Sequence, residues 1–143
     1  MEIIPYERKV FYYETDRMGI VHHSNYIRWM EEARIDYLKQ IGLPYDAMEQ
    51  DGILIPVLAA AAEYKKPFRF GDSFRIELRL VEFSGLKFGI EYEIYKRETE
   101  ELCATGQTRH AFVDSRMMPV KLKKEYPQIY KGLMERLEKK DYT

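Results

Sequence analysis

Two stretches of the chain alternate between apolar and polar residues with a period of two. The first covers residues 73–80 and the second covers residues 88–94, with a Ser84-Gly85 turn between them. This period places one face of a β-strand in a core and the other in water. A third strand is predicted over residues 102–113, after a turn at residues 98–101. Because the connections are short, we expect the strands to pair in antiparallel fashion.

Residues 25–41 carry a different pattern, in which apolar side chains recur every three or four residues. That spacing predicts a helix. Ser24 or Asn25 can cap its amino end, and Gly42 supplies a stop at its carboxyl end. Large apolar side chains lie on more than one face, so we expect this helix to be buried over much of its surface. A short helical turn is predicted at residues 45–50.

Three further segments complete the expected fold. Residues 6–14 are rich in aromatic and β-branched types and predict a strand. The apolar run at residues 53–65 predicts a buried strand, with helix as the alternative for Ala59–Ala62 because alanine favours helix. Residues 123–140 form an amphipathic pattern typical of a helix. The whole chain, 1–143, is predicted to be one α+β domain, an antiparallel sheet packed on one long central helix.

Composition removes several classes of function. The 143 residues include 23 Lys and Arg against 24 Asp and Glu, a net charge of −1, so a general nucleic-acid partner is not expected. Cys103 is the only cysteine and cannot form an intramolecular disulfide. The amino end does not resemble a secretory signal, and the longest apolar run, residues 54–62, is too short to cross a bilayer. We expect a soluble, cytoplasmic protein without a membrane anchor.

Candidate chemistry gathers in residues 14–26. This segment places Asp16, a tight turn at Gly19 and the pair His22-His23 just before the start of the predicted helix. A helix amino terminus presents unpaired N–H groups and partial positive charge, which can stabilise a developing oxyanion. Asp16 could act as nucleophile or general base while amides at the helix start, those of His23 and Ser24, hold the oxyanion.

Simpler interpretations of the same residues stay open. Asp16 could merely cap a turn, and His22 and His23 could be surface or packing residues. A zinc site is not expected, because His110 lies far away in the sequence and there is no cysteine cluster. No nucleophile elbow, Walker loop or dinucleotide-binding glycine motif occurs.

The segment Tyr13-Glu14-Thr15-Asp16, with Gly19, Val21, His23 and Asn25-Tyr26, continues to Glu32-Ala33-Arg34. Together these residues resemble the signature of the 4-hydroxybenzoyl-CoA thioesterase family, most closely its bacterial acyl-CoA thioesterase branch. The resemblance implies a hotdog fold, in which a curved antiparallel sheet wraps around one long helix. It also implies hydrolysis of acyl-CoA thioesters without metal or bound cofactor, by homodimers that often pair into homotetramers and carry their sites at the subunit interface.

The resemblance assigns roles residue by residue. Asp16 matches the catalytic aspartate, and His23 matches the position whose backbone N–H polarises the thioester carbonyl. The ring of His23 can also orient water or substrate. His22 departs from the family pattern, which more often has an apolar residue there.

Four further positions match substrate-binding positions of the family. Tyr26 and Trp29 match a part of the helix that can face the acyl group, and Ile55 matches a position that can line the acyl pocket. Lys87 lies in a turn that can contact CoA, with an ordinary solvated lysine as the alternative. Aryl-specific relatives carry a hydroxyl at the position of Ile55, so an aliphatic acyl group is favoured, because an unpaired buried hydroxyl costs ~1–3 kcal/mol.

Two other functions compete with hydrolysis. A non-catalytic module that binds acyl-CoA or acyl-carrier protein is one, although it would gain nothing from Asp16. A hotdog dehydratase or hydratase is the other, although its motif is missing. Acyl-carrier protein also stays open as a carrier of the substrate.

Two surfaces carry expectations about packing and partners. The carboxyl-terminal helix is predicted to dock on the sheet, with contact to a membrane or to acyl-carrier protein as the alternative. Aromatic residues crowd the late strands at Phe88, Tyr92, Tyr95 and Phe112. They suggest a second covered face of the sheet that could support contact between dimers.

Overall fold

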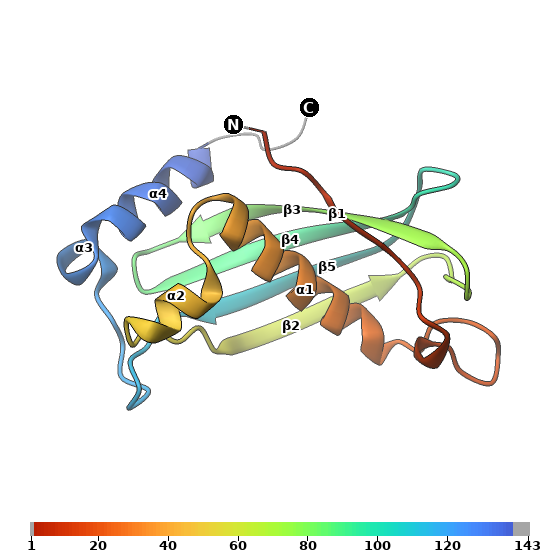
Figure 1. Cartoon of the computed structure of the whole chain (residues 1–143), viewed down its shortest axis with the longest axis horizontal. Coiled ribbons are helices and arrows are strands. Elements are labelled where there is room, and N and C mark those ends of the chain that lie inside the picture. The colour runs from red at the N-terminus through yellow and green to blue at the C-terminus, as the bar shows by residue number, and fades with distance from the viewer. Residues whose placement is uncertain (1, 139–143) are drawn as a thin grey trace.

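A five-stranded antiparallel sheet forms the body of the molecule in the computed structural model, which describes residues 2–138 (Figure 1). The strands lie in the order β1-β3-β4-β5-β2. Their bounds are β1 Tyr6–Lys9, β2 Val57–Tyr64, β3 Ser73–Phe83, β4 Lys87–Lys96 and β5 Glu101–Ala111. The two alternating stretches of the sequence are therefore β3 and β4, and the antiparallel pairing is confirmed.

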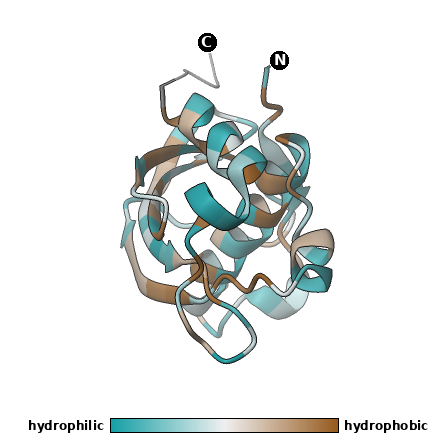
Figure 2. Ribbon diagram, turned by 90° about the vertical axis from the view of Figure 1, so that its left-hand side faces the viewer, coloured by the Kyte–Doolittle hydropathy of each residue, from teal (hydrophilic) through white to brown (hydrophobic). Residues whose placement is uncertain are grey.

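One long helix lies across this sheet, and the shorter helices lie toward one end of it (Figure 1). Their bounds are α1 Ser24–Gln40, α2 Tyr45–Gln50, α3 Leu122–Glu125 and α4 Pro127–Glu138. Seen from the end, the sheet curves around the helical layer (Figure 2). This is the arrangement expected of a hotdog fold. Among residues 2–138, no helix combines the length and the apolar character needed to cross a membrane.

The core is built where α1 meets the sheet. Trp29 is fully buried and stacks on Phe74 of β3, with ring centroids 4.0 Å apart. The next residue of the helix, Met30, approaches β5 at Gly106. A Cβ atom at Gly106 would lie 2.3 Å from Met30 Sδ and 3.1 Å from the carbonyl oxygen of Ala61. Glycine at this position therefore lets the helix approach the sheet closely.

The first predicted strand is shorter than its composition suggested. β1 ends at Lys9, and Tyr12–Glu14 form a 3-10 turn instead of continuing the strand. The turn is stabilised because the Glu14 carboxylate accepts a hydrogen bond from the Phe11 N–H at 2.8 Å. The helix start also differs from expectation. α1 begins at Ser24, and no side-chain cap is formed there, since the Asn25 amide donates to the Glu14 carbonyl oxygen instead.

The prediction of a buried strand at residues 53–65 is right about the strand but wrong about its burial. β2 is a strand, but it forms the sheet edge, and seven of its eight residues are exposed. Pairing with β5 from Ala59 to Tyr64 keeps the alanine run extended and excludes the helical alternative. The buried members of the run, Ile53 and Ile55, lie before the strand.

Of the four aromatic residues of the late strands, only Tyr95 lies outside the core, against the Arg75 guanidinium, so together they do not cover a second sheet face. Phe88, Tyr92 and Phe112 are each 1% exposed and belong to the core cluster on the helix side. The outer face instead carries ion pairs, among them Arg79–Glu91 and Arg109–Glu82, both at 2.8 Å. The aromatic argument for a contact between dimers on this face therefore fails.

The carboxyl-terminal helix packs against the end of the sheet, as expected. Tyr130 of α4 lies against Phe83 of β3 with centroids 5.5 Å apart, and Leu133 is buried. The predicted single helix is divided into α3 and α4 at Tyr126, before Pro127. Residues 139–140 of that prediction lie outside the described residues.

A buried polar group lies between α1 and the middle of the sheet. Thr108 Oγ1 lies 2.6 Å from Tyr92 Oη and 2.7 Å from His110 Nε2. Burial, and secondarily the nearby Arg34 guanidinium, lower the pKa of His110 to about 3. His110 is therefore neutral in the folded protein at every pH at which the protein is expected to work.

His110 should make the fold sensitive to acid. In the unfolded chain its pKa returns to about 6.5, so below that pH the unfolded state binds a proton that the folded state refuses. Stability is fully present above pH 6.5 and is lost progressively toward pH 3, by up to about 1.4 kcal/mol per pH unit. We expect wild type to lose ~2 kcal/mol more than His110→Gln between pH 6.5 and 5 in urea unfolding. Equal losses would contradict the assignment.

Candidate active site

The segment between β1 and α1 folds into a tight loop that returns on itself. Asp16 N–H donates to the Ile20 carbonyl at 2.8 Å, and an antiparallel bridge joins Thr15 and Val21. Gly19 closes the turn with a φ of +79°, a conformation that favours glycine. The loop therefore brings the arm that carries Asp16 back beside the arm that leads into α1, as the sequence predicted.

Asp16 is a half-buried residue, and one oxygen of its carboxylate is engaged. Oδ1 accepts a hydrogen bond from the Met18 N–H at 2.8 Å, so the turn-capping interaction considered from the sequence does form. Within residues 2–138, no hydrogen bond is found to Oδ2. Asp16 therefore has one oxygen that orients the carboxylate and one that is available for chemistry.

The amino end of α1 supplies one unoccupied amide. The His23 N–H has no acceptor in the described part of the chain, whereas the Ser24 N–H points at His22 Nδ1, 3.2 Å away. His22 Nδ1 also lies 2.8 Å from Ser24 Oγ. Of the two amides expected to hold an oxyanion, His23 is thus the one free to donate. Helix polarity adds positive potential at that point.

Aromatic side chains frame this amide. Tyr64, at the end of β2, donates its hydroxyl hydrogen to the His23 carbonyl oxygen at 3.4 Å. Its ring packs edge-on against buried Tyr26, with centroids 4.8 Å apart. Burial raises the pKa of Tyr26 to about 12, so its hydroxyl stays protonated. Asp16, His23 and Tyr26 are therefore brought to the same end of the molecule.

Two of the other expected substrate residues, Ile55 and Lys87, are not brought to this end, and the third, Trp29, reaches it only inside the core, where its ring packs on Tyr26. Trp29 is fully buried, and its indole N–H donates to Glu14 Oε2 at 2.9 Å. Ile55 precedes β2 by two residues, whereas Tyr64 at the other end of β2 contacts His23; an eight-residue strand is ~23 Å long. The residue after Lys87, Phe88, is opposite His110, which in turn is opposite Val57. Ile55 and Lys87 therefore share the sheet end remote from Asp16.

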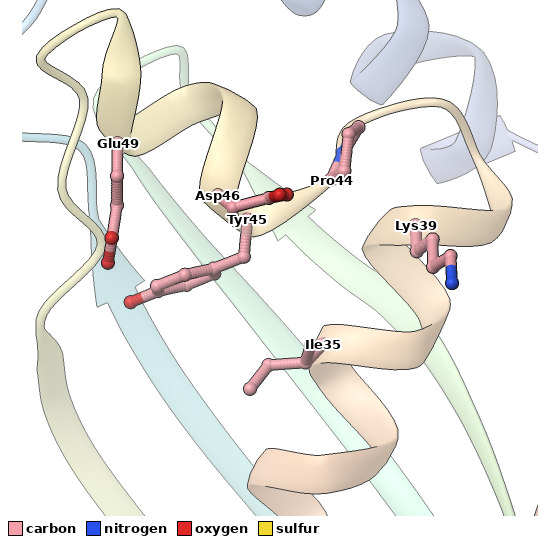
Figure 3. Close-up of a pocket in the computed structure, with 6 residues that line it drawn as sticks. All are labelled: Ile35, Lys39, Pro44, Tyr45, Asp46 and Glu49. Carbon is pink, nitrogen blue, oxygen red and sulfur yellow. The ribbon is translucent and has the colours of Figure 1, made fainter.

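A surface pocket of about 280 Å³ lies elsewhere, between α1 and α2 (Figure 3). It is lined by Ile35, Lys39, Pro44, Tyr45, Asp46 and Glu49. None of the predicted site residues lines it. The candidate site is therefore the Asp16 loop and not this pocket.

Three residues at the site were not singled out from the sequence. Tyr64 contacts His23, and Glu14 and Arg8 form a 2.8 Å ion pair beneath the loop. Glu14 was part of the motif, but nothing local in the sequence indicated its pairing with Arg8. No group of three or more potential metal-ligating side chains is found within residues 2–138.

Comparison with known proteins shows which family the chain belongs to. Residues 10–136 match the model of the thioesterase-like superfamily, which covers most of the chain. The chain belongs to the thioesterase-like superfamily. The expected enzyme class, a thioester hydrolase, and the hotdog fold are thereby confirmed.

Two of the relatives carry names that refer to different thioesters. The chain is 35% identical over 128 residues to a Bacillus subtilis protein provisionally named an acyl-CoA thioesterase, covering 89% of this chain and 92% of that one. It is similar to the structure of a DHNA-CoA thioesterase from Staphylococcus aureus. That match has a TM-score of 0.88 and 31% identity and covers 92% of this chain and 89% of the other. A Thermus thermophilus protein structure matches with a TM-score of 0.85, 34% identity and coverage of 94% and 98%.

Proposed function

We propose that this protein hydrolyses the thioester of an acyl-CoA to a free acid and CoA. The observation that carries the proposal is the Asp16 loop. It presents a free carboxylate oxygen on one arm and the unoccupied His23 N–H on the other, in a chain of the thioesterase-like superfamily. Water is the only other reactant required, so no metal or cofactor is part of the proposal.

Asp16 can serve this reaction in two ways. As a nucleophile, it attacks the carbonyl carbon and forms a mixed anhydride as the carbon–sulfur bond breaks and CoA leaves as the thiolate, which takes up a proton. Water then hydrolyses the anhydride and frees Asp16. As a general base, Asp16 takes a proton from water as the water attacks the same carbon; the carbon–sulfur bond then breaks and the CoA thiolate takes up that proton, which frees Asp16. In both cases the His23 N–H donates to the carbonyl oxygen as it gains negative charge.

The acyl group is proposed to be aliphatic. Ile55 is 4% exposed and offers no hydrogen bond to a hydroxylated ring, at a position where aryl-specific members of the resembled family carry a hydroxyl. The motif resemblance to the acyl-CoA thioesterase branch points the same way. Acyl-carrier protein is the alternative carrier, and a cytoplasmic location stays a prediction.

A second copy of the chain is proposed to complete the site. β2 is an edge strand whose outer side is unpaired, and it exposes Val57, Leu58 and Tyr64 by about half. Such an edge can pair with another strand. Antiparallel pairing of two β2 strands would carry the remote end of the second copy, with its Ile55 and Lys87, toward the Asp16 loop of the first. A homodimer of this kind could pair further into a homotetramer.

Placing charge on this edge should separate the copies. Ala60 is exposed in the single chain, so Ala60→Glu is compatible with the fold, but two such carboxylates would face each other across paired β2 strands. We expect light scattering to show a monomer and kcat/KM to fall at least about tenfold, because positioning of the substrate is lost. Val81→Glu, a matched change at an exposed apolar position of β3, should alter neither the oligomeric state nor kcat/KM. A fully active monomer would contradict the proposal.

Thiol release tests the proposed activity. Wild type is supplied with acyl-CoAs from acetyl to palmitoyl, with benzoyl-CoA and with phenylacetyl-CoA, and the free thiol is followed colorimetrically. We expect turnover with at least one aliphatic acyl-CoA and a higher kcat/KM for it than for either aryl substrate. Turnover restricted to the aryl substrates would overturn the aliphatic assignment. Tight binding without release would instead support a binding module.

A further inference from the structure

The buried Glu14 carboxylate, two residues before Asp16, is fully engaged. Glu14 is 3% exposed. Its oxygens accept hydrogen bonds from Arg8 Nη2 at 2.8 Å and Nη1 at 3.1 Å, from the Phe11 N–H at 2.8 Å, and from Trp29 Nε1 at 2.9 Å. One carboxylate thus joins β1, the 3-10 turn and α1.

The backbone carbonyl of the same residue holds the opposite arm of the loop. It accepts hydrogen bonds from the His22 N–H and from the Asn25 side-chain amide, both at 2.9 Å. His22 precedes His23, and Asn25 lies in the first turn of α1. Glu14 is therefore tied directly to both parts of the candidate site, the segment that leads into Asp16 and the segment that carries the free amide.

The contacts of Glu14 favour the ionised form of its carboxyl group. Burial alone would raise the pKa of Glu14, but the hydrogen bonds from Arg8, Phe11 and Trp29 outweigh burial and lower it. The Arg8 guanidinium is itself fixed, since it lies 4.1 Å over the Phe11 ring and also pairs with Glu32 at 2.8 Å. The ion pair is therefore a rigid support for the loop.

We propose that Glu14, with Arg8 acting through it, is a positioning residue that sets Asp16 relative to the His23 amide. This inference rests on the proposed thioesterase function. Neither Glu14 nor Arg8 touches the substrate. Their effect is to hold the two arms in register, and a misplacement of ~1 Å at a reacting centre can cost about 10²-fold in rate.

Glu14→Gln and Glu32→Gln form a matched pair for the test. Each removes one of the two carboxylates that bind Arg8, but Glu32 contacts Arg8 and Tyr6 and makes no hydrogen bond to the loop. In Glu14→Gln the amide NH₂ must face donors in either orientation, Arg8 together with the Phe11 N–H or Arg8 together with Trp29, so the support is broken. We expect kcat to fall at least about tenfold in Glu14→Gln with KM changed less than about threefold, and both constants to stay within about threefold in Glu32→Gln. Equal effects of the two variants would overturn the proposal.

A second readout separates positioning from general destabilisation. If Glu14 acts through Asp16, adding Glu14→Gln to the Asp16→Asn variant should lower its residual rate by less than about twofold. A general structural effect would instead lower that rate by the same factor by which Glu14→Gln lowers the wild-type rate. Arg8→Lys, which keeps the charge but loses the two-pronged contact, should lower kcat in the same direction and is available if Glu14→Gln fails to fold.

Hydrogen exchange tests the support without reference to activity. The Asp16 and Gly19 amides donate within the loop, to Ile20 and Asp16 respectively. We expect both to exchange faster in Glu14→Gln than in Glu32→Gln. Faster exchange in Glu14→Gln, together with no thiol release from wild type, would contradict the thioesterase function. The role of Glu14 in holding the loop would still stand. Unchanged exchange, together with an unchanged kcat in Glu14→Gln, would contradict the positioning role itself.

Discussion

Replacing Trp29 with alanine is expected to lower the free energy of unfolding by about 3–5 kcal/mol, the usual cost of removing a large buried aromatic side chain. Trp29 is 0% exposed and stacks on Phe74. Its loss also leaves the buried Glu14 carboxylate without one donor. Because small domains are stable by only about 5–15 kcal/mol, this change should remove a large part of the stability of the fold. Urea unfolding followed by far-UV circular dichroism measures it.

Trp29→Phe separates the two contributions. It keeps a ring against Phe74 but removes the indole N–H, so the expected loss is smaller, about 1–3 kcal/mol. If Trp29→Ala instead cost less than about 1 kcal/mol and mainly changed the preference for acyl chain length, Trp29 would line the acyl pocket rather than the core.

Replacing Asp16 with asparagine is expected to lower kcat by at least about 10²-fold, within the range that a general acid or base contributes. The amide has the same shape, and its oxygen can still accept the Met18 N–H, so the loop should keep its conformation. The amide has no negative charge with which to attack a carbonyl carbon or accept a proton from water. The variant isolates the chemistry from the geometry.

Two controls accompany the Asp16 variant. Its free energy of unfolding should stay within about 0.5 kcal/mol of wild type, as for a surface substitution. Asp72→Asn is the control change, because the Asp72 carboxylate also accepts a backbone N–H in a turn, that of Arg69 at 2.8 Å, and pairs with Lys96 at 3.5 Å. We expect Asp72→Asn to keep kcat within about threefold of wild type, since Asp72 is not part of the site. A comparable loss of activity in both variants would indicate a general effect of altered turns.

The strands with one solvent-exposed face were predictable, because side chains of a pleated strand point alternately to the two faces of the sheet and the sequence alternates with the same period. β3 alternates buried and less buried residues from Phe74 to Leu80, as the sequence does. The position of β2 was not predictable in the same way. Its apolar residues suggested burial, but whether a strand lies inside a sheet or at its edge depends on pairing with distant β5. An edge strand that leaves apolar side chains exposed is able to pair with a strand of another chain.

In the candidate site, too, the features set by neighbouring residues were predictable and those set by distant residues were not. The loop at Asp16 could be predicted because its determinants are local: a carboxylate, the turn at Gly19 and a helix that starts a few residues later. The Glu14–Arg8 pair could not, since it depends on the 3-10 turn at Tyr12–Glu14 folding back on β1. Nor could the placement of Lys87 at the remote end of the sheet, which follows from the register of three strands.

The most direct test is the initial rate of CoA thiol release, measured side by side for wild type and Asp16→Asn at equal concentrations of folded protein. The substrate is whichever acyl-CoA wild type turns over fastest. The account predicts multiple turnovers by wild type and a nearly complete loss in the variant. Release by Asp16→Asn at more than about a tenth of the wild-type kcat, or no release by folded wild type from any acyl-CoA, would contradict it.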